Sequence, residues 1–137
     1  MIGILIVSHG AFGESLIHCA SHVLGKRPLR VRQVGVTVHD DPDQILPVAQ
    51  DLVQQLDEGQ GVLVLTDMLG ATPSNIASRL YEPGRVEIIA GVNLPMLVRA
   101  LTYRNESLTA VIAKAVSGGR EGVTYVNEGS ANAAARG

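Results

Sequence analysis

Four short runs rich in aliphatic residues alternate along the chain with longer stretches in which apolar residues recur every three or four positions. The short runs are typical of strands buried on both faces, and the longer period is typical of amphipathic helices. The pattern predicts strands over residues 2–7, 29–38, 62–66 and 86–90, and a last short strand over residues 123–126. It predicts helices over residues 14–24, 74–81, 96–103 and 107–116, and one more that begins near Pro42 and carries an apolar stripe to Leu56.

Glycine, proline and a short polar side chain mark where these elements begin and end. Gly25 closes the first helix, because glycine takes the left-handed C-cap conformation at little cost. Pro73 suits the first turn of the third helix, where Thr72 is the predicted N-cap. The pair Gly118-Gly119 predicts a break after the last helix, and therefore a hinge in front of the strand over residues 123–126.

Regular alternation of strands and helices predicts an α/β fold with a doubly wound, four-stranded parallel sheet. We expect the strand order 2-1-3-4, a single domain over residues 1–127, and a flexible tail over residues 128–137. In such a sheet, ligands bind at the carboxyl ends of the strands, where the strand order reverses. The two loops that meet there are residues 8–10 and 67–72.

Composition narrows the classes of protein that the chain can belong to. The 137 residues are 46% hydrophobic and carry a net charge of −2, which argues against disorder and against a nucleic-acid-binding surface. No apolar run approaches the ~18 residues of a transmembrane helix, and the N-terminus has no basic region typical of a signal peptide. We therefore expect a cytoplasmic protein. A single cysteine excludes a disulfide within the chain.

The two loops at the switch point hold the only concentrated polar chemistry of the chain. His9 follows the first strand and Asp67 follows the third, so the Asp67 carboxylate can accept a hydrogen bond from Nδ1 of His9. That bond would fix the tautomer and leave Nε2 free as a nucleophile. A structural histidine and a turn aspartate are the alternatives that these two residues leave open.

The next helix begins beside these two residues, within the segment Gly70-Ala71-Thr72. Backbone N–H groups at a helix N-terminus favour an anion, and the Thr72 hydroxyl can add a hydrogen bond. Together with His9 and Gly10, the segment predicts a histidine that accepts a phosphoryl group.

The remaining candidate residues are assigned structural roles. His18 and His22 have a spacing that suits a metal ion, but no third acidic or cysteine ligand is in reach, so we expect a plain helix face and no metal site. His39 is expected in a solvated loop and Cys19 in the core. The basic cluster of Arg27, Arg30 and Arg32 is expected at a solvated edge.

Four segments in order resemble the mannose-type IIA family of the bacterial phosphoenolpyruvate-dependent sugar phosphotransferase system. They are Val7-Ser8-His9-Gly10, Val64-Leu65-Thr66-Asp67 followed by Gly70-Ala71-Thr72-Pro73-Ser74-Asn75, Gly91-Val92-Asn93-Leu94-Pro95-Met96-Leu97, and Gly119-Arg120-Glu121-Gly122-Val123. The resemblance extends from residue 2 to about residue 127. Two departures are the segment Met68-Leu69, where the family often has an aromatic residue, and the absence of a IIB domain after the tail.

The resemblance implies a phosphotransferase in which His9 is the phosphorylated residue, Asp67 its Nδ1 partner and Thr72 a neighbour of the phosphate. It implies phospho-HPr as donor, a IIB component as acceptor, and no metal or other cofactor. It also implies a homodimer in which a fifth, antiparallel strand is exchanged between subunits, and at most a peripheral association with a membrane permease.

Three other functions stay open from the residues. In a receiver-like module Asp67 would be the phosphoacceptor, although the acidic metal ligands that receivers carry after the first strand are replaced here by Ser8-His9. A flavin- or nucleotide-binding module suits the sheet but lacks a G-x-G-x-x-G turn and stacking aromatics. A regulatory protein whose phosphorylation state is its output has no feature against it.

Overall fold

Within residues 1–127, which the computed structural model describes, all the strands run parallel in one sheet of order β2-β1-β3-β4. The elements in chain order are β1 (Gly3–His9), α1 (Phe12–Leu24), β2 (Val31–Val36), α2 (Pro42–Leu56), β3 (Val62–Thr66), α3 (Thr72–Ser78), β4 (Val86–Ala90), α4 (Leu94–Tyr103) and α5 (Leu108–Glu121). The predicted α/β class and strand order are confirmed.

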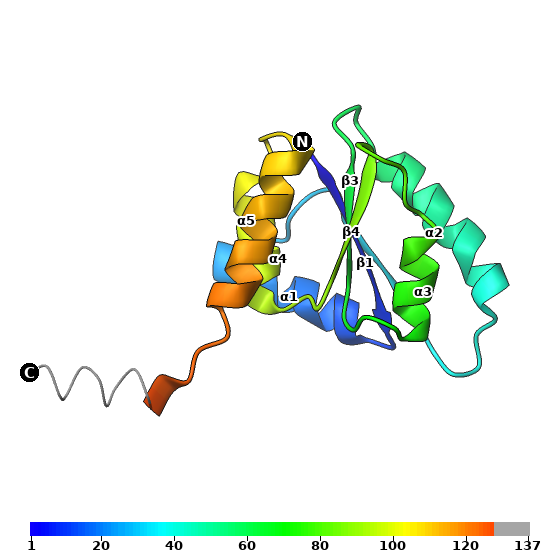
Figure 1. Ribbon diagram of the computed structural model, residues 1–137, viewed down its shortest axis with the longest axis horizontal. Helices are drawn as coiled ribbons and strands as arrows, with labels where there is room; N and C mark the ends of the chain where they lie inside the picture. Colours follow the sequence, from blue (N-terminus) through cyan, green and yellow to red (C-terminus); the bar gives the residue numbers. More distant parts are fainter. Residues whose placement is uncertain (128–137) are drawn as a thin grey trace, which may run out of the picture.

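Two layers of helices cover the sheet. Figure 1 shows α1, α4 and α5 on one side of the strands and α2 and α3 on the other. Ile4 and Ile6 of β1 pack into the core beneath α1, α4 and α5, whereas Leu5 and Val7 pack beneath α2 and α3. Because successive side chains of a strand point to opposite faces, a strand buried on both faces must be continuously apolar. This explains the unbroken aliphatic runs in the sequence.

Most element boundaries lie within two residues of their predicted positions. β3 and β4 have the predicted limits, and α1 and α4 each begin two residues earlier than expected. β2 is shorter than predicted, because Arg30 takes a left-handed conformation with φ of 54° just before the strand. The Leu29 side chain is 74% exposed and takes no part in the core.

Gly118 and Gly119 do not end the last helix, so the predicted break at these residues is wrong. α5 continues through both residues to Glu121. A Cβ added at Gly118 would lie 2.9 Å from Cβ of Arg99 on α4. A Cβ added at Gly119 would lie 2.7 Å from Cε of Met96, also on α4. The two glycines therefore allow α4 and α5 to pack closely, and they are not a hinge.

The described residues after α5, up to Asn127, form no strand. Residues 123–125 are irregular, and Figure 1 shows the chain leaving the body of the molecule there. The side chains of Val123, Tyr125 and Val126 are 78%, 67% and 70% exposed. An exchanged fifth strand thus remains a proposal that needs a second chain. The tail predicted over residues 128–137 lies outside the described residues.

The helices of the described residues are short. α2, with 15 residues, is about 22 Å long, against the ~30 Å of a bilayer core. Nowhere in residues 1–127 does a helix combine the length and the apolar character that crossing a membrane requires.

Cys19 lies on α1 but is exposed, so its predicted place in the core is wrong. The buried face of that helix is a narrow stripe that contains Leu16, Ile17 and Ala20 instead.

A buried arginine joins the ends of three elements at the amino edge of the sheet. Arg104, at the end of α4, is 6% exposed, and its guanidinium donates to the backbone oxygen of Ile2 at 2.7 and 3.0 Å. It also donates to the backbone oxygens of Leu29 and Arg30, just before β2. All of its partners are neutral carbonyls, so the side chain acts as a multiple hydrogen-bond donor inside the fold.

Replacing Arg104 by methionine should therefore strongly destabilise the protein. The substitution keeps an apolar stem of similar length but removes the guanidinium donors from three carbonyls, of which that of Arg30 still accepts from the backbone N–H of Ile4. This loss should lower the free energy of unfolding by about 3 kcal/mol. Arg32→Met, which changes an exposed arginine of β2, should stay within about 0.5 kcal/mol. Denaturant titration of both variants measures the difference. Equal stability of the two would contradict this role of Arg104.

Candidate functional site

The loop after β1 lies tightly against β2. Gly10 has φ of 49°, and its backbone N–H donates to the oxygen of Val36 at 2.9 Å. A Cβ added at Gly35 on β2 would lie only 2.2 Å from the oxygen of Gly10, so no residue with a side chain fits there without moving the loop. Gly35 was not singled out from the sequence, because only the strand pairing shows the close approach.

This loop holds His9 at the carboxyl end of β1, next to β3. By the alternation of the strand, His9 belongs to the same face as Leu5 and Val7, which α2 and α3 cover. The imidazole is 54% exposed, so its outer atoms are open to a partner.

One carboxylate oxygen binds both the backbone and the ring of His9. Oδ2 of Asp67 accepts from the backbone N–H of His9 at 3.1 Å and lies 2.8 Å from Nδ1 of its ring. The structure thus brings together the two residues predicted to meet at the switch point. With Nδ1 donating to Asp67, Nε2 is the nitrogen that carries the free lone pair.

The electrostatics of Asp67 favour its charged form. Partial burial on its own raises the pKa of this carboxyl. The hydrogen bonds from the backbone N–H and the ring of His9, with the attraction of that ring, outweigh burial and hold the pKa below its ordinary value. A carboxylate that stays ionised beside Nδ1 is suited to stabilise a positive imidazolium.

The segment Gly70-Ala71-Thr72 lies where the sequence predicted it, but its capping differs from the prediction. Thr72 is the first residue of α3, and the N-cap position belongs to Ala71, with no side-chain hydrogen bond. The predicted N-cap role of Thr72 is therefore wrong, because its backbone already belongs to the helix. The Thr72 side chain is exposed.

Side-chain capping separates two helices from the other three in the described part of the chain. α1, which begins just after His9, and α3, which begins just after Asp67, have alanine N-caps without a side-chain hydrogen bond. In contrast, α2, α4 and α5 are capped by Asp41, Asn93 and Ser107. The N–H groups at the starts of α1 and α3, which follow the loops that carry His9 and Asp67, therefore have no side-chain cap.

Three buried polar atoms without a hydrogen-bond partner in the described residues lie at the ends of β1 and β3. They are Oγ of Ser8, Oγ1 of Thr66 and Oδ1 of Asp67. Ser8 and Thr66 are fully buried. Thr66 is not among the predicted site residues, and the signal that could have found it is a polar residue at the end of an apolar strand.

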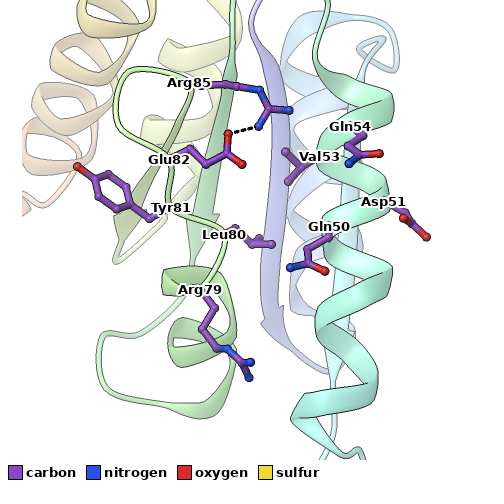
Figure 2. A pocket seen from close by; sticks show the side chains of 9 residues that line it. All are labelled: Gln50, Asp51, Val53, Gln54, Arg79, Leu80, Tyr81, Glu82 and Arg85. Atoms are coloured by element: carbon purple, nitrogen blue, oxygen red, sulfur yellow. Dashed lines mark hydrogen bonds and ion pairs between the residues drawn. The ribbon is translucent and has the colours of Figure 1, made fainter.

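The other predicted residues make no hydrogen bond or ion pair with His9 or Asp67 in the described part of the chain, and a separate hollow lies elsewhere in the fold. His39 is exposed, as expected, and Arg27 and Arg30 pair with Glu14 and Glu58. A polar hollow of about 350 Å³ lies between α2 and the segment that joins α3 to β4 (Figure 2). Both of its arginines are paired: Arg85 binds Glu82, as Figure 2 shows, and Arg79 binds Asp43. The hollow shares no residue with the loops around His9.

Comparisons of the sequence and of the structure with known proteins both find EIIA components of the phosphotransferase system. The model of the EIIA-man family, described as the PTS system fructose IIA component, matches residues 3–116. The mannose-specific EIIAB component of the PTS system of Escherichia coli (strain K12) is 36% identical over 125 residues, which are 89% of this chain. The chain spans only 38% of the length of that relative.

Two further similar proteins differ in how much of their own length the matching region makes up. The transcriptional regulatory protein LevR of Bacillus subtilis (strain 168) is 33% identical over 116 residues, which are 80% of this chain and 12% of LevR. The crystal structure of a phosphotransferase system component EIIA from Streptococcus agalactiae has a TM-score of 0.83 and 27% identity. It matches over 93% of this chain and 99% of its own.

The lowered pKa of Asp67 predicts a pH-dependent contribution to stability. A carboxyl whose pKa is lower in the folded chain stabilises the fold above the unfolded pKa, and this is lost as the pH falls through the folded pKa. The gap in unfolding free energy between wild type and Asp67→Asn should be full at neutral pH and close as the pH falls below about 4. Denaturant titration across this range measures it, with Asp51→Asn, at an exposed position of α2, as control. A gap that does not change with pH would contradict the assignment.

Proposed function

Since the chain belongs to the EIIA-man family, we propose that it is a phosphocarrier of the phosphoenolpyruvate-dependent sugar phosphotransferase system. In this role His9 accepts a phosphoryl group from phospho-HPr and passes it to a IIB component. The observation that carries the proposal is the contact of Asp67 with both the backbone N–H and Nδ1 of His9. It leaves an oriented, half-exposed Nε2 at the carboxyl edge of the sheet.

The chemistry that this geometry supports is a direct transfer between two nucleophiles. The lone pair of Nε2 attacks phosphorus, a bond between Nε2 and phosphorus forms, and the bond from phosphorus to the donor breaks. The ring of His9 then carries a proton on Nδ1 and phosphorus on Nε2, and its positive charge is stabilised by the Asp67 carboxylate. Transfer to the acceptor reverses these steps.

Positioning and hydrogen-bond donors suffice for such a transfer, because a loose phosphoryl transition state needs little covalent help. The phosphoryl oxygens would lie among Gly10, Gly70, Ala71 and Thr72, at the two helix N-termini that lack side-chain caps. We therefore expect no metal ion or other cofactor in this step.

Exposed apolar side chains beside His9 support a protein as its partner. Phe12, the first residue of α1, is 41% exposed, and Met68 and Leu69, directly after Asp67, are 59% and 80% exposed. Apolar residues gathered around a reactive group are typical of a surface that another protein covers. Both the donor HPr and the IIB acceptor are proteins that must reach Nε2.

A receiver-like role for Asp67 is less well supported. The Asp67 side chain is 14% exposed and its Oδ2 is engaged twice by His9, whereas the His9 side chain is 54% exposed. A regulatory role is a second candidate, because a region of LevR, a transcriptional regulatory protein, is similar to this chain. In that case the phosphorylation of His9 would be the output, with the same chemistry at the site.

The proposed dimer rests on an open strand edge. β4 is the last strand of the order β2-β1-β3-β4, so one of its edges has no neighbouring strand within residues 1–127. A hollow of about 380 Å³ beside it is lined by Ile89 and Ala90 of β4 and by Val123. Open strand edges are usually covered. We propose that residues 123–126 of a second copy add to this edge as an antiparallel strand, in a cytoplasmic homodimer.

Phosphorylation is expected on His9. Incubation with phosphoenolpyruvate, enzyme I and HPr should label wild-type protein and should leave His9→Ala unlabelled, because that variant lacks the nucleophilic nitrogen. His39→Ala, which removes another exposed imidazole, is the matched control and should be labelled normally. The product should be labile in acid and stable in alkali, as a phosphohistidine is.

The same assay distinguishes the competing roles of Asp67. Asp67→Asn should still be labelled, but more slowly by a factor on the order of 100, because an amide cannot stabilise imidazolium. Equal labelling of His9→Ala and wild type, or a product that hydroxylamine cleaves, would point to Asp67 as the acceptor and would overturn the proposal.

The chain is expected to be a homodimer of about 29 kDa, twice its own 14.4 kDa. Removal of residues 123–137 should cost dimerisation or solubility, because it deletes the strand that would cover β4. Removal of residues 128–137 alone is the control and should leave the dimer intact. Light scattering at micromolar concentration measures the mass. A monodisperse monomer of wild-type protein would contradict the dimer, and a stable dimer without residues 123–137 would contradict the exchange.

A further inference from the structure

Two exposed histidines on α1 face each other across one helical turn. His18 and His22 are four residues apart, and their Nε2 atoms are 3.3 Å apart. The ring planes meet at 82°, with centroids 4.8 Å apart. In this arrangement one ring presents an N–H and the other a lone pair. The two Nε2 atoms are thus already direct neighbours.

The separation of the two nitrogens matches that of two ligands on one zinc ion. With Zn–N bonds of about 2.0–2.1 Å and a tetrahedral angle, two nitrogens bound to the same ion lie about 3.3–3.4 Å apart. The spacing of His18 and His22 is also that of the two zinc-binding histidines in H-E-x-x-H helices, where i and i+4 side chains share one face. Only small rotations of the rings are needed to direct both lone pairs at one ion.

The surroundings of the pair favour a cation. His22 lies in the last turn of α1, where the helix dipole is negative. The two rings, with Ser21 and Gly25, line a shallow hollow of about 240 Å³ that has room for an ion and its water ligands. Of the two cationic residues just beyond this helix end, Lys26 and Arg27, Arg27 has its charge compensated by Glu14 at 3.0 Å.

We propose that His18 and His22 form a bidentate site for a borderline transition-metal dication, with Zn²⁺ as the ion whose geometry fits. Two Zn–N bonds replace the hydrogen bond between the rings. The proton on the donating Nε2 leaves for solvent, and the same ring takes a proton at Nδ1, so the ligands stay neutral. In residues 1–127 no group of three or more possible ligand side chains converges. Water or an external donor therefore completes the coordination.

The site is separate from the proposed phosphoryl transfer. α1 begins directly after the loop of His9 and runs for 13 residues, about 20 Å, away from the carboxyl ends of the strands. His22, in its last turn, is therefore far from Nε2 of His9. Loss of one function need not affect the other, and each can be tested while the other serves as a check on the fold.

Calorimetric titration of the full chain with ZnCl₂ tests the proposal. Wild-type protein should bind one ion per chain at neutral pH. His22→Ala and His18→Ala should each weaken binding on the order of 100-fold, because the second donor acts at a high effective concentration once the first has bound. His39→Ala is the matched control and should bind as wild type does. The variants should keep wild-type circular dichroism, since both side chains are exposed.

Imidazole ¹⁵N spectra of wild-type protein identify the ligands without any substitution. Zinc should shift Nε2 of His18 and of His22 and leave the ring of His39 unchanged. Shifts at His9 instead, unchanged binding in His22→Ala, or loss of binding in Cys19→Ser would each overturn the proposal. Phosphorylation of His9→Ala and of wild type is measured separately, so failure of the zinc site is distinguishable from failure of the phosphocarrier function.

Discussion

The arrangement of the candidate site depends on one carboxylate oxygen that bridges two neighbouring strands. Oδ2 of Asp67, just beyond β3, binds the backbone N–H and the ring of His9 at the end of β1. The pairing of Val7 with Thr66 sets the register that makes both contacts possible. A shift of one residue between these strands would turn His9 toward the opposite face. The aliphatic core beneath the strands therefore also serves the chemistry, because it fixes this register.

The sequence predicts this part of the molecule well because local and global signals agree. Residues 62–65 are continuously apolar and buried, and such a run is typical of a strand covered on both faces. Once the sheet is parallel, the carboxyl ends of its strands must lie at one edge. The meeting of His9 and Asp67 follows from that topology, and the register then supplies the 2.8 Å contact, which no sequence pattern contains.

The wrong predictions share a dependence on contacts between distant segments. Gly118 and Gly119 have the composition of a break, but they lie within α5, where an added Cβ would meet Arg99 or Met96 of α4. Cys19 has apolar character, yet the covered stripe of α1 is too narrow to include it. Thr72 has the chemistry of an N-cap but takes a place inside α3. Each signal was read from neighbouring residues, whereas the outcome was set by packing.

The histidines of this chain differ in what their ring nitrogens contact. In His9, Nδ1 is held by a carboxylate, so a single oriented nitrogen remains, which is what a nucleophile requires. In His18 and His22 the two Nε2 atoms face each other and no carboxylate binds either one, which is what a chelating pair requires. His39 has neither arrangement among its described contacts. The imidazole group is the same in each case. Its position along the backbone determines whether it is placed as a nucleophile, as a ligand or as a solvated side chain.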